Sequence, residues 1–157
     1  MSLIDSMDLK AQWNRIAPFP GGKALFSKAI GLMAPYTGTI SPRVLELAPG
    51  QARVAMEDRR AVRNHLKSVH AVALANLAEL TGSLAVVASM PSNARMIPIG
   101  LSIEYLKKAR GQITATAGSP VPQTNEKQEL AAEVRLENKA GELVAKATLR
   151  CRVGPKS

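Results

Sequence analysis

The chain has 157 residues, of which 46% are hydrophobic, and this length is that of one compact domain with room for a substantial core. Its 21 Lys and Arg residues against 12 Asp and Glu give a formal net charge of +9, which attracts polyanions. The basic residues are dispersed and only 3% of the residues are aromatic, so the composition disfavours nucleic-acid binding through a basic tail or through stacking of bases.

The cysteine content and the hydropathy of the chain bear on its location in the cell. Cys151 is alone and cannot form a disulfide within the chain, which is typical of a protein from a reducing compartment. Residues 1–13 lack the basic start and the uninterrupted apolar core of a signal peptide. The most apolar stretch, residues 69–88, contains a charge and several polar residues that make it a poor membrane span. We therefore expect a cytoplasmic protein that does not enter a membrane.

The start of the chain, residues 1–39, is predicted to form a helical extension. The first helix is predicted to have Asp8 as its N-cap and to end before Pro18. After a break that extends to Gly22, residues 23–36 again repeat apolar side chains at helical spacing.

The rest of the chain, residues 40–157, is predicted to form one domain that begins with two strands. Residues 43–48 and 52–57 have strand character, and the Pro-Gly turn between them predicts a hairpin. A long apolar helix then extends from about Ser68 to Ala88.

Four further strands are predicted after this helix, because apolar residues recur there with a period of two. The segments are residues 97–106, 111–117, 129–137 and 142–153. Most of their connections are short, so consecutive strands are expected to pair antiparallel as a meander. Each strand has one apolar face, and the long helix is the one segment suited to cover it. The expected fold is α+β, an antiparallel sheet of about six strands wrapped around one long central helix.

Three polar residues interrupt the central helix. Asn76, Glu79 and Ser83 are three and four residues apart, which places them on one face of the helix. If Glu79 is buried, the loss of water raises the pKa of its carboxyl group towards the value that a general base needs near neutral pH. The alternative is a structural role, in which Asn76 and Ser83 are partners of a buried carboxylate.

The start of the same helix is suited to hold an anionic or carbonyl oxygen. Ser68 is the predicted N-cap, and the backbone N–H groups around His70, Ala71 and Val72 then lack partners within the helix, as in an oxyanion hole. A metal site is not expected, because His65 and His70 are the only histidines and no cysteine cluster accompanies them. His65 is assigned a structural or rim position, whereas for His70 a packing or capping role and a role in the site both remain open.

The segment NHLKSVHAVALANLAE, residues 64–79, resembles a known motif. Asn64 precedes His70 by six positions, and Glu79 follows His70 by nine. This pattern is similar to that of the hotdog-fold acyl-CoA thioesterases of the phenylacetate-degradation type, in which Asn, five other residues and His-Gly-Gly precede a catalytic Asp or Glu. The order of the predicted elements over residues 40–153 is also similar to that fold. More narrowly, the segment resembles an uncharacterised branch of the superfamily, with a motif close to NH-x-x-S-x-HA-x-A-x-x-NLAE.

The resemblance implies roles for the residues of the motif. Glu79 would act as general base or nucleophile on the thioester, Asn64 would position water or substrate, and His70 would shape the site. The N–H group of Ala71 would polarise the thioester carbonyl. Further helix residues would contact the substrate, namely Val72, Asn76 and Ser83. The resemblance implies no metal or redox cofactor, and coenzyme A enters as part of the substrate.

The resemblance also implies a homodimer or a dimer of dimers. In such proteins the two central helices lie side by side, and each site is assembled from both subunits. Glu79 would then face the partner's Asn64 and the partner's Ala71.

Two further features bear on the ligand. The basic side chains that could meet the phosphates of coenzyme A, or could equally belong to solvated turns, are Lys107, Lys108, Arg110, Arg59, Arg60 and Arg63. Ala71 and Val72 stand where the family motif has two glycines, which adds side chains where backbone approaches the substrate. This difference leaves a second function open, that of a non-catalytic module that binds acyl groups or acyl-CoA.

Overall fold

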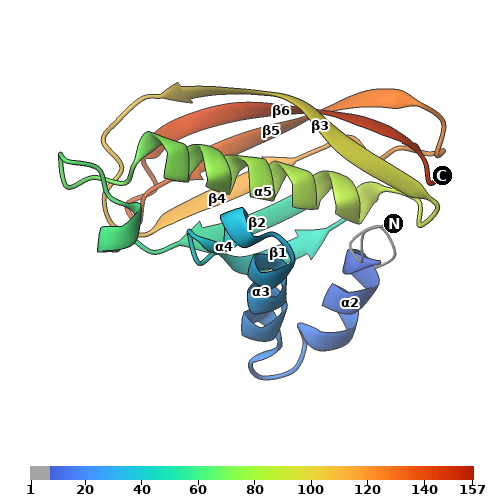
Figure 1. The fold of residues 1–157 in the computed structure, drawn as a ribbon, viewed down its shortest axis with the longest axis horizontal. Coiled ribbons are helices and arrows are strands. Elements are labelled where there is room, and N and C mark those ends of the chain that lie inside the picture. The colour runs from blue at the N-terminus through green and yellow to red at the C-terminus, as the bar shows by residue number, and fades with distance from the viewer. Residues whose placement is uncertain (1–7) are drawn as a thin grey trace.

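A six-stranded antiparallel sheet with the strand order β1-β2-β4-β5-β6-β3 curves around the long helix α5 (Figure 1). This computed structural model describes residues 8–157, so residues 1–7, which fall in the segment unlike a signal peptide, lie outside the described residues. The helix α5 comprises Ala71–Ser89, and the strands are β1 Arg43–Ala48, β2 Gln51–Met56, β3 Ala94–Tyr105, β4 Ile113–Gly118, β5 Gln128–Glu137 and β6 Leu143–Pro155. The expected α+β architecture is confirmed.

Three helices precede the sheet and lie on one side of α5 (Figure 1). They are α2 Leu9–Ile16, α3 Gly22–Met33 and the single turn α4 Pro35–Gly38. α2 begins where the sequence predicts, because the Asp8 carboxylate accepts a hydrogen bond from the Ala11 N–H at 3.0 Å.

Side chains of α3 hold this helical extension against its neighbours. Phe26 meets Trp13 of α2 edge to face, with ring centroids 5.1 Å apart. The Ser27 hydroxyl accepts a hydrogen bond from the Val44 N–H of β1 at 2.8 Å. The extension is therefore tied to the first strand, and a division of the chain after residue 39 stays a prediction.

The strands after α5 depart from the predicted meander. β4, β5 and β6 are consecutive antiparallel neighbours as expected, but β3 pairs with β6, and β4 pairs with β2. The reason is α5, which crosses the concave face of the sheet and delivers the chain to the edge farthest from β1. β3 is consequently an edge strand.

A β-bulge in β3 splits the apolar row that the sequence predicts there. The register shifts between Pro98 and Gly100, so Ile97 lies opposite Arg152 on the outer face and is 53% exposed. Leu101, in contrast, lies opposite the buried Leu149 on the inner face. Leu101 is still 37% exposed, because the edge strand reaches beyond the cover that α5 provides.

Helix α5 begins later than predicted, because a loop uses the predicted cap. The N-cap is His70, whose Nδ1 accepts a hydrogen bond from the Val72 N–H at 3.0 Å. Ser68 is buried in the preceding loop, where its hydroxyl donates to Asn64 Oδ1 at 3.1 Å. The prediction of Ser68 as the cap was therefore wrong.

The core lies between α5 and the concave face of the sheet. Leu77 of α5 has no exposed surface, and neither have Ile113 and Leu136 of the facing strands. The helix and the sheet approach closely at Gly82, where an added Cβ would lie 2.9 Å from Leu149 Cδ2. α5 is long and apolar enough to cross a membrane, but 61% of its most apolar stretch is buried in the fold, as befits a core helix.

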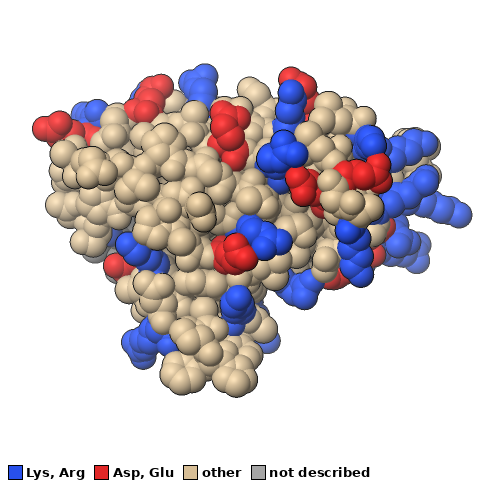
Figure 2. All heavy atoms as spheres, turned by 180° about the vertical axis from the view of Figure 1, so that it is seen from behind, with Lys and Arg blue, Asp and Glu red and all other residues tan. Residues whose placement is uncertain are grey.

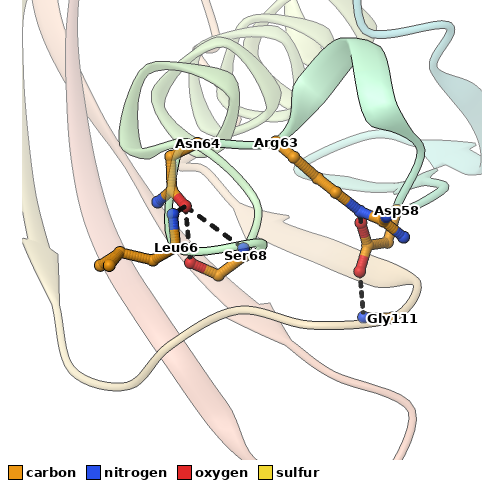
Figure 3. A network of polar contacts seen from close by, with 6 residues as sticks. All are labelled: Asp58, Arg63, Asn64, Leu66, Ser68 and Gly111. Atoms are coloured by element: carbon orange, nitrogen blue, oxygen red, sulfur yellow. Dashed lines mark hydrogen bonds and ion pairs between the residues drawn. The ribbon is translucent and has the colours of Figure 1, made fainter.

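The segment between β2 and α5 is held by a carboxylate that no motif in the sequence indicated (Figure 3). Asp58 accepts hydrogen bonds from Arg63 Nε at 2.7 Å and from the Gly111 N–H at 2.8 Å, which joins this segment to the loop between β3 and β4. Burial acts to raise the pKa of the Asp58 carboxyl, but the two hydrogen bonds and the charges of Arg63 and Arg110 together hold that pKa below its usual value.

Replacing Asp58 with alanine should lower the free energy of unfolding by about 1–3 kcal/mol, because two hydrogen bonds to a largely buried carboxylate are lost. Since folding lowers the pKa of this group, its contribution is present above the usual aspartate pKa of about 3.9. It is lost as the pH falls through the lower native pKa. Urea unfolding of wild type and Asp58→Ala at neutral pH and at about pH 2 measures both effects.

The control for this prediction is Glu46→Ala, since Glu46 forms an exposed ion pair with Arg53 at 2.8 Å. Its loss should cost at most about 1 kcal/mol at equal protein concentration. Equal destabilisation by the two variants at neutral pH would contradict the role of Asp58.

Candidate functional site

Glu79 and Ser83 form a polar pair on the side of α5 that the sheet does not cover. Ser83 Oγ donates a hydrogen bond to Glu79 Oε1 at 2.9 Å, and both residues are half-buried. Asn76 is buried, but its Nδ2 donates to the Tyr36 carbonyl of α4 at 3.2 Å. The structure therefore brings together two of the three polar residues predicted on this face. Asn76 instead fixes the helical extension to α5.

The open side of α5 is a stripe of small, aliphatic and polar residues. The sheet lies behind α5 in the view of Figure 1, which leaves the front of the helix uncovered. Val72 is 51% exposed, and the other members of the stripe are half-buried: Ala71, Ala75, Glu79, Ser83 and Val87. The helix is thus buried on one side only, although its sequence is apolar nearly all round.

The Glu79–Ser83 pair borders a cleft of about 400 Å³. The second half of α5 forms its floor, and its walls come from the start of α2, from α3 and α4, and from the start of β3. Three charged residues also line it, namely Asp8, Arg95 and Lys156. A carboxylate, a hydroxyl and a mainly aliphatic surface therefore meet at one place, where a molecule with a reactive polar group and an apolar tail would fit.

Cys151 of β6 lies close enough to Glu79 to be affected by its charge. Burial raises the pKa of the Cys151 thiol to about 11, and the negative charge of Glu79 adds to this increase. The thiol therefore stays protonated at neutral pH and cannot act as a thiolate nucleophile.

The N-terminus of α5 offers a free backbone donor. The Val72 N–H is bound to His70 Nδ1, and the His70 N–H donates to the Val62 carbonyl at 2.7 Å. Between them, the Ala71 N–H has no acceptor among residues 8–157. The Tyr105 hydroxyl of β3 donates to the Ala71 carbonyl at 3.0 Å and so fixes the position of this turn. Of the predicted donors, Ala71 is therefore available to an oxygen atom, whereas His70 and Val72 are not.

Asn64 organises the loop before α5 (Figure 3). Its Oδ1 accepts hydrogen bonds from the Leu66 N–H at 2.9 Å and from the Ser68 N–H at 3.2 Å, in addition to the Ser68 hydroxyl. Its Nδ2 has no acceptor in the part of the chain that the structure describes. The predicted role of Asn64 in positioning water or substrate stays a prediction, and His65 is exposed on the same loop.

The six basic residues predicted to meet coenzyme A form two clusters, within residues 59–63 and 107–110. The clusters are far apart in sequence but lie side by side at the N-terminal end of α5. The Val69 N–H donates to the Ala109 carbonyl at 2.8 Å, which joins the segment after Arg59 to the loop that contains Lys107. Figure 2 shows Lys and Arg side chains gathered towards the corresponding end of the molecule, at the right of that view. Acidic and basic groups are mixed over the rest of that face.

Half of the six basic side chains are engaged by other groups of the protein. Arg63 is bound to Asp58, Lys107 pairs with Glu142 at 2.6 Å, and Arg59 donates to the Thr39 carbonyl. The other three of these six side chains are exposed and have no such bond within residues 8–157, namely Arg60, Lys108 and Arg110.

The two halves of the predicted site lie apart within one subunit. Asn64, His70 and Ala71 are at the start of α5, whereas Glu79 is eight residues beyond Ala71, which is about 12 Å along the helix. A hydrogen bond spans about 3 Å, so one chain cannot place a single substrate carbonyl against both groups. Among residues 8–157, no three His, Cys, Asp or Glu side chains are grouped as metal ligands.

Solved structures resemble the chain over most of its length. The crystal structure of the genomics target APC5556 is 33% identical, covers 96% of this chain and 100% of its own, and has a TM-score of 0.82. PA5026 from Pseudomonas aeruginosa, a protein of unknown function described as a probable thioesterase, is 23% identical over 88% of this chain and 97% of its own, with a TM-score of 0.75. The thioesterase HI1161 from Haemophilus influenzae is 15% identical over 76% of this chain and 82% of its own, with a TM-score of 0.67.

These likenesses confirm the hotdog fold that the sequence motif implied. No curated protein matches the chain. The sequence model of a domain of unknown function, DUF4442, matches residues 22–153, which include α3, α5 and all six strands but for the end of β6. The chain is therefore a member of the DUF4442 family and has the hotdog fold.

Proposed function

We propose that this protein is a homodimeric thioesterase that hydrolyses acyl-CoA, with Glu79 as the base that activates water. The placement of Glu79 carries the proposal, because a carboxylate held by the Ser83 hydroxyl borders a mainly aliphatic cleft on the open side of α5. The fold that the chain shares with the thioesterase HI1161 supports it. The lone cysteine and this substrate are both suited to the cytoplasm.

The open side of α5 and the edge strand β3 supply a surface for a second copy of the chain. The apolar side chains of Val72, Leu101 and Tyr105 are all more than a third exposed. Tyr105 contacts the start of α5, so the exposed apolar surface is continuous between strand and helix. A surface of this kind beside an open strand edge is typical of a subunit interface.

Antiparallel pairing of two α5 helices would complete the site. Ala75 lies midway between Ala71 and Glu79 in sequence, and its small side chain permits close approach of a second helix. A twofold axis beside Ala75 places Glu79 of one subunit opposite the partner's Ala71. The separation of about 12 Å within one chain then becomes a short distance across the interface. A dimer of dimers is compatible with the same arrangement.

In the proposed reaction Glu79 takes a proton from water as the water oxygen bonds to the thioester carbonyl carbon. The partner's Ala71 N–H donates to the oxyanion that develops on the carbonyl oxygen. Collapse of the tetrahedral intermediate breaks the C–S bond, and the proton held by Glu79 passes to the departing thiolate of coenzyme A. Direct attack by Glu79, followed by hydrolysis of the acyl-enzyme, is the alternative route. Neither route calls for a metal or redox cofactor.

The basic end of the molecule is suited to the phosphates of coenzyme A. Arg60, Lys108 and Arg110 are exposed. The segments that carry them are joined to the start of α5, because the His70 N–H donates to the Val62 carbonyl and the Val69 N–H to the Ala109 carbonyl. Phosphate groups there would be attracted both by these side chains and by the positive end of the helix.

A non-catalytic acyl-CoA binding protein is the second candidate, and the first turn of α5 favours it. The Val72 side chain projects where the family motif has glycine, and the Val72 N–H is already bound to His70. One of the predicted donors is thereby lost to a substrate oxygen, and the predicted donor that stays free is the Ala71 N–H.

Replacing Glu79 with glutamine should reduce kcat/KM for acyl-CoA hydrolysis by at least about 100-fold, because the amide cannot accept the proton from water. The melting temperature should stay close to that of wild type, since Glu79 is only half-buried and glutamine keeps an acceptor for Ser83. Release of free thiol from a panel of acyl-CoAs measures the rates.

The matched control for this prediction is Glu129→Gln, which removes a carboxylate from an exposed pair with Arg152 and should leave the rates unchanged. Equal rates for Glu79→Gln and wild type would exclude Glu79 as the base. Tight binding of acyl-CoA by a wild-type protein that hydrolyses none of the panel would favour the binding module.

Replacing Leu101 with arginine should convert the dimer to monomers, because a charge would be buried where the inner face of β3 meets the second copy. Hydrolysis should be lost with the dimer. Ser102→Arg is the control, since Ser102 is exposed and is paired with Thr148 on the outer face. Light scattering coupled to gel filtration measures the mass, and a dimeric, active Leu101→Arg variant would contradict the interface.

A further inference from the structure

The cleft beside Glu79 is elongated along the axis of α5. Its lining on this side extends from Glu79 to Met90, which is the C-cap of α5, a separation of eleven positions or about 16 Å along the helix axis. The Glu79–Ser83 pair stands at one end, and the helix residues beyond it that line the cleft are aliphatic or methionine, among them Leu84 and Val87. A cleft with one reactive end and a mainly apolar trough beyond it is complementary in shape to an acyl thioester.

The side chains around the cleft favour an acyl group that is a flexible hydrocarbon chain over one that contains an aromatic ring. Three methionines, one from each wall and one from the end of the floor, contribute to it: Met33, Met90 and Met96. Unbranched thioether side chains adapt to hydrocarbon chains of different conformation. No aromatic residue is among those that line the described cleft, so an aromatic acyl group would find no ring to pack against.

The wall formed by α3 and α4 is fixed before any ligand binds. Besides the Ser27 bond to β1, Lys23 Nζ donates to the Leu45 carbonyl at 2.8 Å. On the other side, the buried Asn76 amide holds the Tyr36 carbonyl of α4 against α5. A pocket whose walls are already in place binds its ligand without a cost for ordering them.

We propose that this cleft is the acyl-binding pocket and that the preferred substrates are thioesters of unbranched aliphatic acids of about 8 to 12 carbons. Tetrahedral C–C bonds of about 1.5 Å advance an extended chain by about 1.3 Å per carbon, so a chain of this length fills a trough of about 16 Å. The inference rests on the proposed function, because it takes Glu79 as the end of the cleft where the thioester lies. The helical extension then has a defined role, that of one wall of the acyl pocket.

The test uses a substitution in the fixed wall that narrows the cleft. Met33→Trp places a large ring in the trough, and Leu32→Trp is the matched control, because the neighbouring Leu32 is 73% exposed and does not line this cleft. The wild type and Leu32→Trp should hydrolyse dodecanoyl-CoA with a kcat/KM at least about tenfold above that for butanoyl-CoA, since each buried methylene adds to transition-state binding. Met33→Trp should lose this preference, so that the ratio of its kcat/KM for dodecanoyl-CoA to that for butanoyl-CoA falls to about one.

A binding measurement separates this proposal from the proposed hydrolysis. S-dodecyl-CoA and S-butyl-CoA are thioethers that cannot be hydrolysed, and calorimetry should show tighter binding of the dodecyl compound to wild type but not to Met33→Trp. If the wild type shows this binding pattern but hydrolyses no acyl-CoA, the proposed pocket is supported and the proposed hydrolysis is excluded. Val87→Trp, on the floor of the cleft, repeats the test if thermal melting shows that Met33→Trp does not fold.

Two results would overturn the pocket. The first is turnover of phenylacetyl-CoA as fast as that of dodecanoyl-CoA, or an unchanged chain-length preference in a folded Met33→Trp protein. The second is loss of the dimer in Met33→Trp, which would assign the cleft to contacts between subunits.

Discussion

The packing of α5 across the concave face of one sheet is the constraint on which the other features of this molecule depend. The sheet buries one side of the helix completely, down to the close contact between Gly82 and Leu149. Because the helix occupies that face, the chain emerges from it at the far edge, and β3 must form the edge strand. The uncovered side of α5 and the uncovered edge of β3 are therefore two results of one packing arrangement.

This arrangement explains why an almost wholly apolar helix carries a carboxylate. Glu79 is on the open side, half-buried in a single chain and held by Ser83. In the proposed dimer a second α5 would cover this side and enclose the carboxylate together with the cleft. The loop bonds of Asp58 and Asn64 and the Tyr105 hydroxyl act at the other end of the helix, where they fix the position of the free Ala71 N–H.

The sequence was sufficient for the parts of the structure that depend on local pattern. The alternation of apolar residues located the strands, and the cap at Asp8 located the first helix. Local pattern did not predict the contacts between segments that are distant in sequence. By residue type Ser68 is a better cap than His70. In the structure, however, the Ser68 hydroxyl and N–H both donate to Asn64 Oδ1 in the loop before the helix, and His70 caps α5 instead.

The same limit applies to strand pairing and to the candidate site. The short connections favoured a meander, but β3 pairs with β6 because the end of α5 places the following segment at the sheet edge farthest from β1. Asp58 and Tyr105 belong to no motif, and the Gly111 N–H and the Ala71 carbonyl that they bind are 53 and 34 residues away in sequence. Asn76 has the correct spacing from Glu79, yet a carbonyl 40 residues earlier binds its amide. Spacing along a helix therefore predicts a shared face, and the groups that approach that face decide the role of each residue.

The central claim is that each site combines Glu79 of one subunit with Ala71 of the other, and mixed dimers test it most directly. Ala71 is the first residue of α5, where proline is tolerated and removes only the N–H group, and the extended His70 before it is compatible with proline. Glu79→Gln and Ala71→Pro homodimers should both be inactive. Co-expression of the two chains should restore about one quarter of wild-type activity, because half of randomly paired dimers contain one intact site of two. No recovery in mixed dimers of confirmed composition would contradict a site shared between subunits.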